Sequence, residues 1–186
     1  MDEHQLRQQL CQATHQLWTR GMAPGDSGSV SVECHRRRYL VTPPGRRRSN
    51  LHNEDLLVVD IGGEAVEGHI LPANYWRPHR MAYQSNGLAQ TSVGPGIHAA
   101  IVVRPPMTLA LLRRRGTTDR IVLPGTDPLV CVGREDEAAI AEALRETTVI
   151  ALDAEHVLAV GPDLNIALNT LERLEHAATI ELAATR

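Results

Sequence analysis

Few side chains in this 186-residue chain have the types and spacing that covalent or metal chemistry requires. The three cysteines, Cys11, Cys34 and Cys131, form no CxxC pair, which argues against a disulfide scaffold and against a zinc ribbon. Every basic residue is an arginine. The absence of lysine excludes a Schiff-base nucleophile and a nucleotide-binding Walker A loop, because both need a lysine amine.

Two glycine-containing segments offer groups that bind anions. Residues 25–32 read Gly-Asp-Ser-Gly-Ser-Val-Ser-Val, and residues 42–45 read Thr-Pro-Pro-Gly. Backbone amides in glycine-rich turns can surround an anion, although the carboxylate of Asp26 opposes one. The triplet Arg46–Arg48 follows the second segment. A run of arginines at a turn is typical of a solvated surface; the alternative is that it attracts an anion toward these segments.

The composition indicates one soluble domain spanning residues 1–186. A hydrophobic content of 42% is enough for one substantial core, whereas the length is too short for two full domains. No segment approaches the ~18 apolar residues of a membrane span, and the first residues are polar and unlike a signal peptide. The net charge of −3 and the lack of phenylalanine argue against nucleic-acid binding. We therefore expect a cytoplasmic protein with neither a membrane nor a nucleic acid as partner.

Hydrophobic periodicity predicts the elements that position these groups. Helices are expected over residues 4–20, 75–85, 107–115, 135–146 and 163–184. Strands are expected over residues 29–32, 39–42, 56–60, 97–103, 129–132, 149–152 and 157–160. Asp163 is the expected N-cap of the last helix, and residues 86–96 have the composition of a flexible loop. The irregular order of helices, strands and hairpins predicts an α/β fold with a central, mostly antiparallel sheet flanked by helices.

Six segments, in order, resemble the class II aldolase/adducin family, most closely its fuculose-phosphate aldolase branch. They are residues 25–32, 42–45, 54–63, 71–85 and 100–102, and the stretch from Val157 through the final helix. The longest reads LPANYWRPHRMAYQS and is similar to the family's LPSSEWRxHxxxYQS. The resemblance implies an αβα sandwich, and it implies a homotetramer whose active sites lie between subunits.

In this family, three histidines hold a zinc ion that polarises a substrate carbonyl, and a glutamate moves the proton. The two histidines of the family's HxH correspond here to Val103 and Pro105, or to Val102 and Arg104 if the register is one residue earlier. The third corresponds to Glu155. None of these positions carries a histidine, so we expect no metal site and no cofactor.

The family's catalytic glutamate corresponds to Tyr75, so the candidates for catalytic roles are Tyr75, Glu155 and the neighbouring His156. His79 matches a helical histidine of the family, and we expect it to be packed and hydrogen-bonded. The family's phosphate contacts are also partly changed. The candidate donors to a phosphate or other substrate group are Ser27, Gly28, Ser29, Gly45 and Asn74.

Three functions are compatible with these replacements. The leading interpretation is a pseudoenzyme, a non-catalytic binding, regulatory or partner subunit that takes a small oxygenated or phosphorylated metabolite. The second is a lyase, an aldolase or a related enzyme, that acts on a small sugar-phosphate-like carbonyl substrate through Tyr75, Glu155, His156 or His79. The third is a mixed oligomer in which this chain donates residues to a paralogous, active aldolase.

Overall fold

The computed structural model describes residues 2–65, 70–87, 96–116, 119–133 and 136–184. The helices are α1 (Glu3–Thr19), α2 (Ala73–Gln84), α3 (Pro106–Arg115), α4 (Glu137–Glu146) and α5 (Leu164–Ala184). The strands are β1 (Ser29–His35), β2 (Arg38–Val41), β3 (Leu57–Asp60), β4 (Ala99–Val103), β5 (Arg120–Ile121), β6 (Leu129–Val132), β7 (Val149–Leu152) and β8 (His156–Gly161). Most of the loop expected over residues 86–96 lies outside the described ranges.

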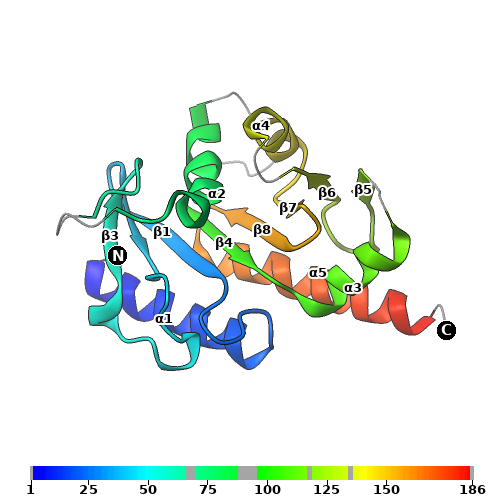
Figure 1. Cartoon of the computed structure of the whole chain (residues 1–186), viewed down its shortest axis with the longest axis horizontal. Helices are drawn as coiled ribbons and strands as arrows, with labels where there is room; N and C mark the ends of the chain where they lie inside the picture. Colours follow the sequence, from blue (N-terminus) through cyan, green and yellow to red (C-terminus); the bar gives the residue numbers. More distant parts are fainter. Residues whose placement is uncertain (1, 66–69, 88–95, 117–118, 134–135, 185–186) are drawn as a thin grey trace.

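The eight strands form one sheet in the order β3-β2-β1-β4-β8-β7-β6-β5. Every neighbouring pair is antiparallel except β6 and β7, which are parallel. Helices α2 and α4 cover one face of this sheet, and α1, α3 and α5 lie on the other (Figure 1). The predicted α/β class and the mostly antiparallel sheet are therefore confirmed.

Alternating side chains along the central strands build two cores, one on each face of the sheet. Ile101 and Val103 of β4 belong to the core shared with α1, α3 and α5. Ala100 and Val102 belong to the core beneath α2 and α4. Both sets are buried because helices cover both faces, which explains why β4 is a continuous apolar run without alternation.

The structure extends one predicted strand and adds a strand that was not predicted. β1 continues to His35, and the chain turns at residues 36–37, where Arg37 adopts a positive φ of 58°. β5 was not predicted, because two residues at the sheet edge carry too little pattern to be recognised. The N-cap is confirmed, since the Asp163 carboxylate accepts the Ile166 N–H at 2.8 Å. None of the helices in the described ranges is long and apolar enough to span a membrane.

Several segments that are distant in sequence meet at one end of the sheet. β1 begins at this end and β4 ends there, because Ser29 pairs with Val102. β8 also begins there, because Val103 pairs with Val157. The loops that precede β1 and follow β2 therefore border the same end, next to the first turn of α2.

Candidate functional site

A cavity of about 450 Å³ lies at this end of the sheet. It is lined by Asp26, Pro44, Gly45, Pro72, Asn74, Tyr75 and His156. The lining therefore combines the loop before β1, the loop after β2, the N-terminus of α2 and the first residue of β8. A carboxylate, an amide and an imidazole are the polar side chains offered to a ligand here, together with the backbone of the glycine-containing loop.

The structure brings together half of the predicted site residues at the cavity. Gly45, Asn74, Tyr75 and His156 line it. Glu155 is exposed on the turn between β7 and β8 and is not part of the lining. Because Glu155 and His156 are adjacent at the start of a strand, only one of them can face this side of the sheet.

The three predicted donors of the first loop are not among the residues that line the cavity. The Ser29 hydroxyl is buried and lies 2.6 Å from Nε2 of His79. The Ser27 hydroxyl is buried without a hydrogen-bond partner among the described residues. The carbonyl of Gly28 accepts hydrogen bonds from Arg48, and a β-carbon at this glycine would lie 3.0 Å from the Val102 carbonyl oxygen. Gly28 therefore serves the close approach of the loop to β4.

The hydroxyl of Tyr75 is occupied by the protein itself. It donates to the Thr42 carbonyl at 2.6 Å, accepts from Nη2 of Arg48 at 3.1 Å and lies 3.0 Å from the Thr42 hydroxyl. Burial raises the pKa of Tyr75, against the opposing effect of the Arg48 charge. The phenol is thus a fixed, neutral group in the cavity wall.

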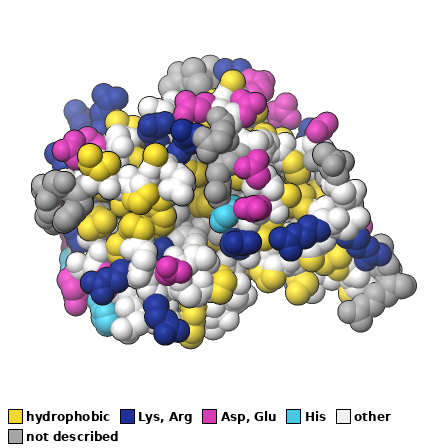
Figure 2. All heavy atoms as spheres, viewed as in Figure 1, with side chains coloured by type: hydrophobic (Ala, Val, Ile, Leu, Met, Phe, Trp, Pro, Cys, Tyr) yellow, Lys and Arg dark blue, Asp and Glu magenta, His cyan; other side chains and the backbone are white. Residues whose placement is uncertain are grey.

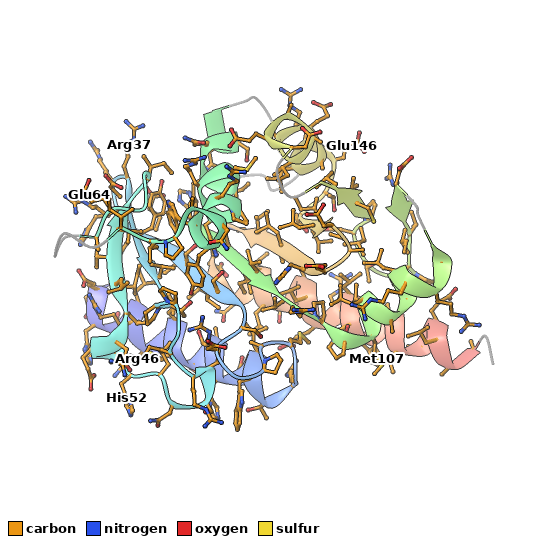
Figure 3. The ribbon with its side chains drawn as sticks, viewed as in Figure 1. Arg37, Arg46, His52, Glu64, Met107 and Glu146 are labelled. Atoms are coloured by element: carbon orange, nitrogen blue, oxygen red, sulfur yellow. The ribbon has the colours of Figure 1, made fainter. Side chains whose placement is uncertain are left out.

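The solvated position predicted for the Arg46–Arg48 triplet is wrong for Arg48. Its side chain is buried, with 1% of its surface exposed, whereas Arg46 and Arg47 are exposed. Arg46 projects from the loop into solvent, with Asp55 3.7 Å away (Figure 3). The triplet therefore consists of two solvated arginines and one internal arginine, and the difference depends on tertiary packing.

The Arg48 guanidinium holds the two cavity loops together. It donates to the carbonyls of Ser27, Gly28, Pro43 and Arg46, and to the Tyr75 hydroxyl. These bonds use all five N–H groups of an arginine, so none is left for an anion. It forms no ion pair with a carboxylate in the described part of the chain. The carbonyl dipoles offset the cost of burying its charge.

A second buried network attaches α2 to β1. Nδ1 of His79 lies 2.7 Å from the Ser31 hydroxyl, which in turn lies 2.6 Å from the Tyr83 hydroxyl. The indole of Trp76 stacks on the imidazole. Burial lowers the pKa of His79 to about 3, so the ring is neutral. His79 is the packed, hydrogen-bonded histidine that was predicted, and it does not reach the cavity.

The residues at the family's zinc positions do not fit a zinc site. Val103 faces the core beneath α1, α3 and α5, on the side of the sheet opposite the cavity, and Pro105 is buried. The first register considered is therefore wrong, because a shift of one residue reverses the face of a strand. Val102 faces the cavity side, and Arg104 follows it by two residues. Among the described residues, no three His, Cys, Asp or Glu side chains are grouped to hold a metal ion.

Comparison with known proteins places this geometry in context. Residues 8–182 match the family model described as Class II Aldolase and Adducin N-terminal domain. A methylthioribulose-1-phosphate dehydratase of Pseudomonas aeruginosa, strain UCBPP-PA14, is 28% identical over 122 residues, which are 66% of this chain and 55% of that protein. The enzyme of the same name from Pectobacterium atrosepticum is 28% identical over 98 residues, 53% of this chain and 46% of that protein. The chain thus spans about half the length of these curated relatives.

Solved structures share the fold over almost the whole chain. YgbL from Klebsiella pneumoniae superposes with a TM-score of 0.81 at 24% identity, covering 98% of this chain and 91% of that one. L-fuculose-1-phosphate aldolase from Thermus thermophilus superposes with a TM-score of 0.76 at 24% identity, covering 94% of this chain and 92% of that one. At this level of identity the likeness establishes the architecture, and the chemistry has to be argued from the cavity.

Proposed function

Because the chain belongs to the class II aldolase and adducin family, we propose that it binds a small oxygenated or phosphorylated metabolite without zinc chemistry. The observation that supports this most directly is the hydrogen bonding of the Tyr75 hydroxyl. At the position of the family's proton-transferring glutamate, the chain has a phenol whose hydroxyl is fully engaged by Arg48 and Thr42. Such a group shapes a cavity well but has no free proton site to offer a substrate.

The cavity keeps features that suit a polar, anionic ligand. Asn74 lies in the first turn of α2, a helix of 12 residues whose N-terminal amides favour negative charge. Gly45 also lines the cavity, and its backbone lies in the left-handed region (φ 72°), which a glycine adopts without steric cost. The carboxylate of Asp26 repels an anion bound next to it, and it can instead accept a hydrogen bond from a ligand hydroxyl.

The second candidate is an enzyme that works without a metal ion. It is favoured by one observation, that two titratable side chains, His156 and Asp26, line the same cavity. Removal of water from a hydroxy-carbonyl compound needs one group to accept a proton and another to protonate the leaving hydroxyl. In this reading, His156 and Asp26 take those roles, and Tyr75 and Glu155 take none.

Binding and turnover can be separated with the purified protein. Isothermal titration with sugar phosphates, including methylthioribulose 1-phosphate and fuculose 1-phosphate, is expected to give binding without product and without an effect of a chelator. Asn74→Asp should weaken phosphorylated ligands, because it places a carboxylate beside the bound anion and so adds charge repulsion. Asn169→Asp, an equivalent change on the exposed side of α5, should leave binding unchanged.

The alternatives give different results in the same experiment. Turnover that persists in the presence of a chelator and is lost in His156→Gln would support the metal-free enzyme instead of the binding role. About one divalent metal per chain by elemental analysis, together with turnover lost on chelation, would overturn the proposal altogether.

A further inference from the structure

Arg104 carries a charge that nothing in the described part of the chain neutralises. It directly follows β4, and its backbone N–H donates to the Met22 carbonyl at 2.9 Å. Its side chain is exposed and forms no hydrogen bond or ion pair with the described residues. Arg48, by contrast, uses every donor on the loops. Arg48 and Arg104 therefore differ in function: Arg48 binds the loops, whereas the guanidinium of Arg104 is available to a ligand.

The strand register brings Arg104 to His156. β4 and β8 are antiparallel, and their ladder pairs Val102 with Leu158 and Val103 with Val157. One further step along each strand leads to Arg104 and His156. Val102 and Leu158 both face the core on the α2 side, and side chains alternate along a strand, so the next pair on that face is Arg104 with His156.

This pairing lies at the edge of the cavity already described, because His156 is part of its lining. Figure 2 shows histidine, arginine and acidic side chains gathered near the middle of the visible face. Two acidic residues belong to the same region as Arg104 and His156. Asp26 lines the cavity, and Glu155 is exposed and directly precedes His156 in the chain. Neither forms an ion pair with Arg104 within the described ranges.

We infer that Arg104 and His156 together bind an oxyanion of the ligand, a carboxylate or a phosphate group. This rests on the proposed function and specifies the ligand class for the same cavity. A guanidinium presents parallel N–H donors that match two oxygens of an oxyanion, and an imidazole N–H can add a third donor. Asp26, which lines the same cavity, is then placed to accept a hydrogen bond from a ligand hydroxyl. The ligand is a short hydroxylated molecule with an anionic end, and a neutral polyol is a poor substitute.

A titration of the purified 186-residue protein tests this assignment. The probes are inorganic phosphate, glycolate, glycerol 3-phosphate and uncharged glycerol. Binding of each probe is measured by calorimetry and by the rise in melting temperature that binding to the folded state causes. The wild type should bind the three anions and not glycerol. Arg104→Gln should weaken the anions by about tenfold or more, the usual effect of losing a hydrogen bond to a charged group. Comparing glycolate with phosphate identifies which oxyanion is preferred.

The control removes the same charge at the other end of β1. Arg36 is exposed in the β1–β2 turn, whose tip is marked by Arg37 in Figure 3, and Arg36→Gln should bind as the wild type does. Equal binding by wild type and Arg104→Gln, or equal binding of glycerol and the anions, would overturn this inference and leave the metabolite-binding role in place. Failure of every probe and of every sugar phosphate to bind would overturn both.

Discussion

At the scale of single residues, one buried arginine decides what the cavity can do. Arg48 ties the loop before β1 to the loop after β2, and it fixes the hydroxyl of Tyr75 at the cavity wall. A tyrosine at this position would be an acid or base candidate if it were free. Its three contacts with Arg48 and Thr42 make it part of the framework that holds the loops.

Tyr75→Phe tests that structural role. Removing the hydroxyl leaves one Arg48 N–H and one Thr42 carbonyl without a partner, so the free energy of unfolding should fall by about 1–2 kcal/mol. Urea denaturation measures the change. Tyr39→Phe is the matched control, because the Tyr39 hydroxyl makes no hydrogen bond with the described residues although its ring stacks on Tyr83. Unchanged stability in Tyr75→Phe would contradict the assignment.

His79 should make the fold sensitive to acid. Its pKa is about 3 in the folded protein because of burial, compared with 6.5 in an exposed histidine. Between these two values the unfolded chain binds more protons than the folded chain, so the stability present above pH 6.5 is progressively lost as the pH falls toward 3.

The measurement is urea denaturation repeated across that range of pH. His79→Gln keeps a hydrogen-bonding side chain but cannot titrate, so it should be less stable at neutral pH and show a flatter decline toward acid. His4→Gln, a change of an exposed histidine on α1, should keep the wild-type slope. An equal slope in His79→Gln and wild type would show that other groups cause the acid sensitivity.

At the scale of elements, α5 holds the start of α3. Pro105 is the N-cap residue of α3 and Pro106 is its first residue, and neither can cap the helix through a side-chain hydrogen bond. Glu175 of α5 takes that role: its carboxylate accepts the N–H groups of Met107 and Thr108 at 2.7 and 2.9 Å, and the Thr108 hydroxyl at 2.8 Å. A negative charge at a helix N-terminus is also favoured by the helix dipole.

Glu175→Ala should therefore lower the free energy of unfolding by about 1–2 kcal/mol, the range for loss of a helix N-cap. Hydrogen exchange should locate the loss in the first turn of α3. Glu142→Ala removes an exposed carboxylate paired with Arg145 within α4, and it should cost less than about 1 kcal/mol. Equal effects of the two changes would mean that Glu175 is an ordinary surface charge.

At the scale of the whole molecule, apolar side chains remain on the surface of the single chain. Ile70 is 75% exposed, Val122 64% and Ile180 56%. Ile180 also borders a groove of about 280 Å³ between α5 and residues 124–126. An exposed apolar group beside a groove is a feature of surfaces that another chain covers, so we expect a subunit contact at this groove.

We predict that the purified protein is a homotetramer, as the family resemblance implies, and that light scattering at micromolar concentration gives four times the chain mass. Ile180→Asp should shift the mass toward smaller species if α5 lies in an interface. A monomeric wild type would contradict the prediction. Co-purification with a paralogous aldolase, and activity only in that mixture, would support the mixed oligomer instead.

The order of helices and strands was determined by the sequence itself. Apolar spacing along 4–20, 135–146 and 163–184 predicts α1, α4 and α5, because the periodicity of a helix is encoded by near neighbours. The continuous apolar run at 97–103 likewise predicts a buried strand. The alignment of Tyr75 with a catalytic position was also available from the order of motifs. These features depend on residues that are close together in the chain.

Only the tertiary structure decided what the site residues contact. Arg48 differs from Arg46 because the loop of residues 25–28 folds back over it, and no local pattern records that approach. Val102 and Val103 are alike in sequence terms, yet pairing with β8 sends one to the cavity side and the other away. Pairing across strands fixes the face of each side chain, and a displacement of one residue reverses it.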